Sequence, residues 1–215
     1  NGPRPRFNNL MLRIYLARHG QDKDNANGIL NGRRDEPLSE KGIEQADEVA
    51  DKIKATRIHF GHVYSSPLQR AYKTAEIITQ KLGINKPEIL EDLIERDFGI
   101  MTGKQQSTIK NVCSPDIFQT DTICYFLNPE GAETFPQLVE RAKKLLDMLK
   151  VKHKDENILL VTHGDFGKMI YTAYYNLDWK EVLKMFHFGN SELLELSEES
   201  EPEETHVFKI QQHNL

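Results

Sequence analysis

The sequence predicts a three-layer α/β/α sandwich, in which a mostly parallel central sheet lies between two layers of helices. Strand-like and helix-like patterns alternate along most of the 215 residues, and this alternation is typical of a parallel sheet with helices on both faces. The clearest strand is residues 158–162 (ILLVT), an uninterrupted apolar run that indicates a buried strand. Two further runs near the end of the chain predict a terminal β-hairpin.

The first half of the chain predicts strand, helix, strand, helix and strand in that order. Residues 12–17 (LRIYLA) are a short, mostly apolar run, typical of a buried strand. Residues 40–54 predict a helix, because apolar residues recur there at helical spacing: Ile43, Ala46, Val49, Ala50 and Ile53. Residues 61–65 (GHVYS) predict a strand, residues 67–82 a helix, and residues 89–93 (ILEDL) a further strand.

In the second half, the apolar face of a helix is traced by Leu138, Val139, Ala142, Leu145, Leu146 and Leu149. The strand at 158–162 is followed by a helix that continues to about Asn176. Residues 192–197 (ELLELS) and 205–211 (THVFKIQ) predict the hairpin strands, joined by an acidic turn. Residues 104–130 have no clean periodicity and predict an irregular insertion.

Composition narrows the class of protein. We expect residues 11–215 to form one domain, and residues 1–10 to be a disordered tail or a remnant of the expression vector. The net charge of −5 argues against a nucleic-acid partner. No apolar run approaches the ~20 residues that span a bilayer, and no signal peptide opens the chain, so we expect a cytoplasmic protein without a membrane partner. Cys113 and Cys124 form no CxxC pair and are expected to be free thiols.

Cationic and titratable side chains follow three of the predicted strands. Arg18, His19 and Gly20 follow the first strand, Arg70 lies shortly after the second, and His163 follows the strand at 158–162. The carboxyl ends of parallel strands share one edge of a sheet, where ligands bind. We therefore expect two guanidinium groups and two imidazoles at one rim.

Two helices are expected to begin at this rim. Ser66 is a good N-cap and Pro67 a good first residue, which puts Arg70 in the first turn. The sequence His163-Gly164-Asp165 opens the other helix. Unpaired N–H groups at helix starts bind anions, and arginine can contact two phosphate oxygens at once. These residues favour a phosphate site.

Five ordered stretches of the chain resemble the histidine phosphatase superfamily, branch 1, whose members are phosphoglycerate mutase-like. They are RHGQDKDN, GRRDEPLSEKGIEQA, VYSSPLQRAYKTAEI, LIERDFG with GAETF, and LLVTHGD. The resemblance implies the three-layer fold and phosphoryl transfer through a covalent phosphohistidine, with neither a metal nor another cofactor.

The same resemblance implies a role for each matched residue. His19 is the nucleophile and Glu95 the proton donor. Arg18, Arg70, His163 and Asn25 form the phosphate pocket, with Gly20, Gln21 and Gly164 beside it. We expect Gly20 to let the backbone approach the phosphate.

The chemistry predicts protonation states for the titratable groups. His19 must be unprotonated to attack, neighbouring arginines should lower its pKa, and a backbone carbonyl should bind its other nitrogen. We expect His163 to be protonated. A bound phosphate dianion should raise the pKa of Glu95, which would protonate the leaving alcohol and later activate water.

The substrate is expected to be a small phosphorylated metabolite, with inorganic phosphate as the product. We favour a phosphatase over a mutase, because residues 105–121 of the substrate-selecting insertion contain no arginine and only one lysine, Lys110.

Two alternatives remain: a catalytically weak phospho-ligand or phosphoprotein binder, and a metal site built from His19, His163, Asp22 and Asp165. Gln21 and Asp22 depart from the usual family opening, and an acid at 22 would either add negative charge near the phosphate or point away. Whether the protein forms a homodimer is left open by the sequence.

Several other side chains carry expectations that do not concern the phosphate. Phe118, Tyr125 and Phe126 either cover the leaving group as a lid or pack the insertion. His59 and His62 are expected to be surface groups rather than ligands. Asn190 and Ser191 are expected to form a structural turn.

Overall fold

The structure, a computed structural model, describes residues 11–199, 201–202 and 205–208. Its centre is a five-stranded sheet with the order β3-β2-β6-β1-β7. The strands are β1 (Arg13–Arg18), β2 (His62–Ser65), β3 (Glu88–Ile89), β6 (Asn157–Thr162) and β7 (Leu193–Leu196). Only β7 runs antiparallel to its neighbour. The predicted mostly parallel sheet is confirmed, and the predicted tail, residues 1–10, lies outside the described residues.

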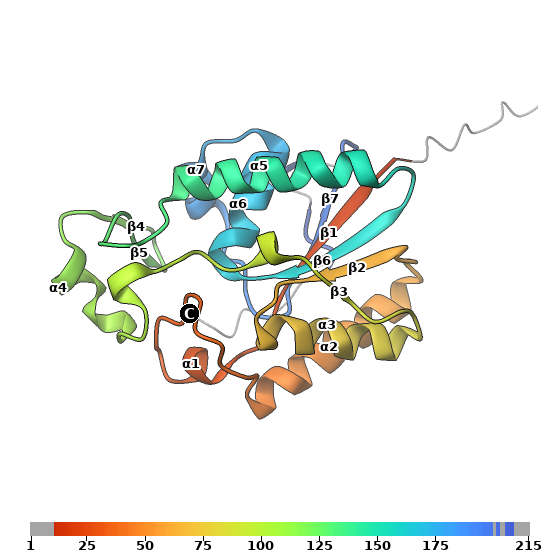
Figure 1. Ribbon diagram of the computed structural model, residues 1–215, viewed down its shortest axis with the longest axis horizontal. Coiled ribbons are helices and arrows are strands. Elements are labelled where there is room, and N and C mark those ends of the chain that lie inside the picture. Colours follow the sequence, from red (N-terminus) through yellow and green to blue (C-terminus); the bar gives the residue numbers. More distant parts are fainter. Residues whose placement is uncertain (1–10, 200, 203–204, 209–215) are drawn as a thin grey trace, which may run out of the picture.

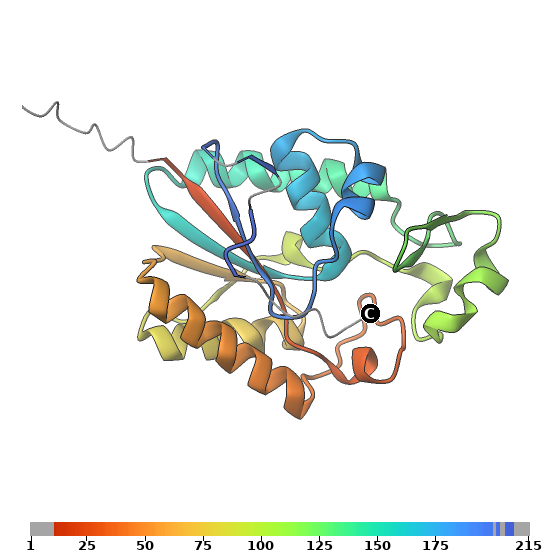
Figure 2. The ribbon, with the colours of Figure 1, turned by 180° about the vertical axis from the view of Figure 1, so that it is seen from behind.

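Helices cover both faces of this sheet (Figures 1 and 2). One layer contains α2 (Glu40–Thr56) and α3 (Gln69–Leu82); the other contains α5 (Phe135–Lys152), α6 (Gly164–Tyr175) and α7 (Trp179–Met185). Successive residues of β1 serve opposite layers: Ile14 and Leu16 join the core with α5 and α6, whereas Tyr15 and Ala17 join the core with α2 and α3. This alternation explains why the central strands are apolar throughout.

Local sequence signals set the helix ends. The Ser39 side chain accepts the N–H of Gly42 at 3.1 Å and begins α2. Thr134 and Gln137 form a capping box at the start of α5. α3 ends at Gly83, whose φ of 67° is in the left-handed region that glycine adopts without strain.

The strand predicted at 89–93 is wrong over most of its length. β3 covers only Glu88–Ile89, and Glu91–Leu93 form a 3₁₀ turn. The turn places Leu93 in the core, where it is fully buried, and its carbonyl accepts a hydrogen bond from Thr162 Oγ1 at 2.8 Å. The chain is thereby directed toward the sheet edge that receives Glu95.

The insertion at 104–130 is more regular than predicted. It contains a 3₁₀ turn (Gln106–Thr108), α4 (Ile109–Cys113), and the antiparallel strands β4 (Ile117–Gln119) and β5 (Cys124–Phe126). Elements this short do not produce a recognisable period. They surround a small separate core that includes Met101, Ile109 and Phe126. Cys113 and Cys124 are free, as expected.

The terminal hairpin forms only in part within the described residues. β7 is paired through one bridge, Leu194 with His206, flanked by hydrogen bonds from Glu195 N to Thr205 O and from Val207 N to Leu193 O. Residues 209–211 of the second predicted strand and part of the acidic turn lie outside the described residues. Within the described part, every helix is too short or too polar to cross a membrane.

Strand register brings the predicted rim together. Arg18 of β1 is opposite Thr162 of β6, and Ser65 of β2 is opposite Val161. The residues that follow these strands, His19, Ser66 and His163, therefore emerge side by side. The short helix α1 (Lys23–Ala26) and the insertion lie at this end of the sheet (Figure 1).

Candidate active site

His19 leaves the end of β1 with one ring nitrogen already engaged. Its backbone N–H donates to Thr162 O at 3.1 Å and extends the pairing with β6 by one residue. The ring Nδ1 lies 2.6 Å from Gly20 O. Because a carbonyl can only accept, Nδ1 carries the proton and Nε2 holds the lone pair. The predicted backbone hydrogen bond is present, and it leaves the lone pair on Nε2, as a nucleophilic role would require.

Gly20 has a packing role that the sequence did not predict. A Cβ at this position would lie 2.2 Å from Gly42 O, and a Cβ on Gly42 would lie 1.9 Å from Gln21 O. The two glycines therefore let the loop after β1 touch the first turn of α2. Close packing of these two backbone segments explains both glycines, and the expected approach of the Gly20 backbone to phosphate stays a prediction.

Arg70 reaches His19 from the first turn of α3. The side chain is fully buried, with Nε 3.3 Å from His19 Nε2. Its two terminal nitrogens donate to Arg34 O at 2.6 Å and Gly32 O at 2.7 Å. Three N–H groups of the guanidinium thus have acceptors, His19 Nε2, Arg34 O and Gly32 O, so its plane is held in one orientation.

The predicted start of α3 is wrong by two residues. The helix begins at Gln69, and its N-cap, Leu68, makes no side-chain hydrogen bond. Ser66 Oγ instead accepts the N–H of Leu68 at 3.3 Å and lies 2.7 Å from His163 Nε2. Ser66 thus orients the second histidine, and Arg70 still falls in the first turn.

His163 is the N-cap of α6 and faces His19. The ring centroids are 5.0 Å apart with planes tilted by 58°. Its Nδ1 is buried and has no hydrogen-bond partner among the described residues. The two imidazoles meet at the predicted rim, and one of them presents an unsatisfied nitrogen there.

The protonation states of the two histidines agree with expectation for His19 only. Burial, reinforced by Arg70 and Arg18, lowers the pKa of His19 well below its usual value, so Nε2 is unprotonated at neutral pH. Burial and Arg70 also lower the pKa of His163 well below its usual value. The expected protonated His163 is therefore wrong for the ligand-free protein. A phosphate dianion would act in the opposite direction, because an anion favours the charged ring.

Arg18 lies against the start of α6. One terminal nitrogen donates to Phe188 O at 2.7 Å, while its buried Nε has no partner among the described residues. A Cβ at Gly164 would lie 3.6 Å from this Nε. Arg18 Nε and His163 Nδ1 are therefore two orphaned polar atoms at one helix N-terminus. A buried polar group without a partner costs about 1–3 kcal/mol, which an oxyanion ligand would recover.

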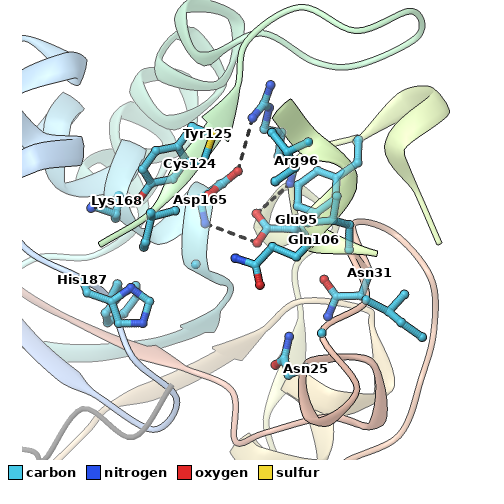
Figure 3. A pocket seen from close by; sticks show the side chains of 18 of the residues that line it. Asn25, Asn31, Glu95, Arg96, Gln106, Cys124, Tyr125, Asp165, Lys168 and His187 are labelled. Carbon is cyan, nitrogen blue, oxygen red and sulfur yellow. Dashed lines mark hydrogen bonds and ion pairs between the residues drawn. The ribbon is translucent and has the colours of Figure 1, made fainter. Parts of the chain in front are cut away.

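Glu95 is bound to the same helix terminus. Its Oε1 accepts the N–H groups of Arg96 at 2.8 Å and Phe166 at 3.0 Å. Its Oε2 accepts the N–H of Asp165 at 3.3 Å (Figure 3). Burial first, and then the nearby Asp165 carboxylate, raise the pKa of Glu95, although the backbone donors oppose this. The raised pKa was expected from bound phosphate; here burial and Asp165 already produce it.

Asp22 points into the site. The side chain is fully buried, with Oδ2 3.3 Å from Arg70 Nε and 3.9 Å from His19 Nδ1. Oδ1 accepts the N–H of Asn25 at 2.8 Å, and Oδ2 accepts from Asn31 Nδ2 at 2.6 Å. Of the two alternatives for this position, the structure selects the one in which the acid lies beside the arginine that is expected to bind phosphate. Burial raises the pKa of Asp22, although Arg70 opposes this.

A cavity of about 440 Å³ adjoins these groups (Figure 3). Arg18, Gln21, Asn25, Glu95 and Gly164 line it, whereas the more deeply buried His19, Arg70 and His163 do not. The insertion supplies part of the wall: Gln106, Ile109 and residues 122–126. Cavities of this size hold small molecules with apolar and polar parts.

The three aromatic residues for which the sequence left a lid or a packing role open, Phe118, Tyr125 and Phe126, differ in position. Tyr125 and Phe126 line the cavity, and each is less than a tenth exposed. Phe118 lies away from it, with its ring 6.3 Å from that of Trp179. Tyr125 and Phe126 form fixed walls of the cavity, and Phe118 packs the insertion.

Sequence reasoning missed three charged or polar wall residues. Lys168, on the inner side of α6, donates to Leu183 O at 3.0 Å and to Phe186 O, and burial lowers its pKa to about 8. Asn190 lines the cavity besides donating to His19 O at 2.9 Å, so it is more than a turn residue. Arg96 pairs with Asp165 at 3.4 Å. A lone lysine inside the apolar stretch 166–171 was the available signal for Lys168.

Comparison with known proteins agrees with this geometry. The family model for the histidine phosphatase superfamily (branch 1) matches residues 14–210. A 2,3-bisphosphoglycerate-dependent phosphoglycerate mutase from Parvibaculum lavamentivorans is 30% identical over 176 residues, which are 80% of this chain and 84% of the relative. A metal-independent phosphoserine phosphatase from Arabidopsis thaliana is 33% identical over 163 residues, 74% of this chain and 66% of the relative.

A solved structure is similar over most of its length. It is the phosphoserine phosphatase of Entamoeba histolytica in complex with 3-phosphoglyceric acid. The TM-score is 0.70 at 27% identity, and the match covers 86% of this chain and 90% of the other. Relatives named as mutases and relatives named as phosphatases are thus comparably similar to this chain.

Proposed function

Because the chain belongs to the histidine phosphatase superfamily, branch 1, we propose that it is a phosphomonoester phosphatase that works through a phosphohistidine at His19. The substrate is a small phosphorylated metabolite, and the protein is cytoplasmic and metal-independent. The observation that carries this proposal is the meeting of a neutral His19 Nε2 with two orphaned polar atoms, Arg18 Nε and His163 Nδ1, at the start of α6.

In the first step, His19 Nε2 attacks phosphorus and the bond from phosphorus to the alcohol oxygen breaks. Arg70 Nε, which donates to Nε2 in the ligand-free site, donates instead to an oxygen of the bound phosphate and frees the lone pair. Glu95 transfers its proton to the departing oxygen. The charge that spreads over the equatorial oxygens meets Arg18 and Arg70, which are already in position beside the positive end of the α6 dipole.

In the second step, water attacks the phosphohistidine. Glu95, now a carboxylate, takes a proton from the water as the new phosphorus–oxygen bond forms and the bond to Nε2 breaks. Inorganic phosphate leaves, and Glu95 is protonated again for the next cycle. One carboxyl group with a raised pKa serves both steps.

Charge in the cavity favours hydrolysis over mutase chemistry. Its lining contains three cationic side chains, Arg18, Arg96 and Lys168, and two acids, Glu95 and Asp165. Arg96 is already bound by Asp165 and by the carbonyls of Glu133, Phe126 and Leu127. Few positive groups are left for the second phosphate of a bisphosphate, so a monophosphate fits this wall better.

The mutase remains the second candidate, because a relative with that name is 30% identical. One experiment separates the two. The purified chain is incubated with 3-phosphoglycerate and with a panel of phosphate esters, and both inorganic phosphate and 2-phosphoglycerate are measured. We expect phosphate release to exceed isomerisation; faster isomerisation would make the chain a mutase.

The phosphohistidine is tested with His19→Ala, and His59→Ala serves as a matched control at an exposed histidine. We expect the His19 variant to lose turnover of p-nitrophenyl phosphate and an acid-labile, base-stable phosphoenzyme. The control should retain both. If wild type and His19→Ala turned over equally slowly while binding phosphate, the chain would be a phospho-ligand binder.

A further inference from the structure

A second group of ligand-type side chains lies at the end of the sheet away from the cavity. His62 begins β2, His153 is the C-cap of α5, and Glu156 immediately precedes β6. One candidate ligand atom from each residue lies within 4.8 Å of the other two, and no other group of three among the described residues meets this condition. Figure 1 shows the start of β2 and the turn from α5 to β6 together, far from α1 and α4.

We propose that His62, His153 and Glu156 bind one divalent transition-metal ion, with Zn²⁺ as the preferred ion. Two imidazoles and one carboxylate suit Zn²⁺, and a water molecule would complete the usual four ligands. His153 Nδ1 and Glu156 Oε1 lie 2.8 Å apart and share a proton. The ion would take the place of that proton on Nδ1, and the proton would move to His153 Nε2, so that the imidazole stays neutral as the two metal–ligand bonds form.

The groups that surround the two histidines support this assignment. His62 Nδ1 lies 2.9 Å from Glu88 Oε1, and His153 Nε2 lies 2.9 Å from the Tyr64 hydroxyl. Each imidazole therefore has an oxygen partner on one nitrogen, which leaves His62 Nε2 and His153 Nδ1 for the ion. Histidines that bind metals almost always have such a partner on the other nitrogen, because it fixes the ring and its tautomer.

The nearby charges also favour a cation. Glu156 and Glu88 supply two carboxylates, and the Lys152 ammonium group donates to the Tyr64 hydroxyl at 2.7 Å rather than to a ligand atom. His153 is 3% exposed, whereas the side chains of His62 and Glu156 are 39% and 28% exposed. One ligand is thus held rigidly in the core, and the other two are reachable from solvent.

The role of the ion would be to tie three chain segments together. It would join the start of β2, the end of α5 and the start of β6. The two strands are already paired there, with Gly61 N donating to Asn157 O at 2.9 Å, so the ion would chiefly fasten the end of α5 to them. A ligand that binds the folded state alone raises the melting temperature with concentration. Because the cavity lies at the opposite end of the sheet, the ion would stabilise the fold without entering the phosphoryl-transfer chemistry.

The experiment titrates the full chain, without a histidine tag, with Zn²⁺ by calorimetry and with Co²⁺ by visible absorption. We expect one equivalent to bind, with a Co²⁺ spectrum typical of four-coordinate nitrogen and oxygen ligation, and a rise in melting temperature with Zn²⁺. His62→Ala should weaken binding at least tenfold. His59→Ala, at an exposed histidine three residues away, should leave it unchanged.

Two further variants separate this site from others. Glu88→Gln keeps an acceptor for His62 but removes the charge, and it should weaken Zn²⁺ about tenfold, as expected for a partner of a metal ligand. His19→Ala should bind Zn²⁺ like the wild type, since the catalytic histidines do not contribute. Absence of a Zn²⁺ equivalent, or equal affinity of the wild type and His62→Ala, would overturn the proposal.

Discussion

Asp165→Asn offers the sharpest test of Glu95 as the general acid. Burial and the Asp165 carboxylate raise the pKa of Glu95, and the backbone N–H of Asp165 donates to Glu95 Oε2 at 3.3 Å. The amide variant removes the nearby negative charge. It also frees Arg96, whose Nη1 lies 3.4 Å from Asp165 Oδ2, to act as an unbalanced cation near Glu95. Both changes lower the pKa of Glu95.

The size of the change follows from Coulomb's law. Two unit charges roughly 6 Å apart at an effective dielectric constant of about 20 repel by about 3 kcal/mol, which corresponds to about 2 pKa units. The Asp165 side chain is 17% exposed, so solvent screens part of this repulsion, and we expect a shift of about one unit. A general acid works while it is protonated, so activity is present below the pKa of Glu95 and is lost as pH rises through it. The alkaline limb should therefore move about one pH unit lower.

The assay is kcat/KM against pH, because this ratio reports only the steps up to departure of the alcohol. An alkyl phosphate with a poor leaving group should show the shift. p-Nitrophenyl phosphate, whose leaving group needs little protonation, should show almost none. Asp121→Asn, an exposed acid between β4 and β5, is the matched control. An alkaline limb that stays in place in Asp165→Asn with the alkyl ester would refute the acid role derived for Glu95.

Three other predictions concern the surroundings of the site. Gly42→Ala should destabilise the fold by about 3 kcal/mol or more, since its Cβ would lie 1.9 Å from Gln21 O. Urea unfolding measures this loss. Gly83→Ala is the comparison, because its Cβ would meet open space and any loss there comes from the left-handed φ alone. Asp22→Asn should lower kcat/KM at least tenfold and the free energy of unfolding by about 1–3 kcal/mol. The reason is that Asn25 N, Asn31 Nδ2 and Arg70 Nε all need acceptor atoms there. If the variant kept wild-type kinetics, Arg70 would need no such partner. Lys168→Met should remove a rise in wild-type stability between about pH 8 and 10, because the folded pKa of about 8 lies below the unfolded value and the unfolded chain binds more protons in that window. Parallel stability curves for both proteins across this range would exclude Lys168 as the source.

Much of the architecture could be predicted because it depends on short-range patterns. The run at 158–162 and the helical spacing in 40–54 reflect burial of regular elements, and such elements leave a period in the chain. Where elements were shorter than one period, prediction was wrong: α4, β4 and β5 were predicted as irregular, and most of the strand at 89–93 is a turn. The meeting of His19 with His163 followed from topology, since both residues come after parallel strands.

The sequence by itself determined the fold class, the branch of the superfamily and the residues that gather at the rim, because strand ends and motif order are properties of the chain. Only the tertiary structure decided the state of those residues. Burial keeps His163 neutral in the ligand-free protein, Asp22 reaches Arg70, and Lys168 enters the cavity wall. These outcomes depend on desolvation and on distances between distant segments, and neither quantity is set by local sequence.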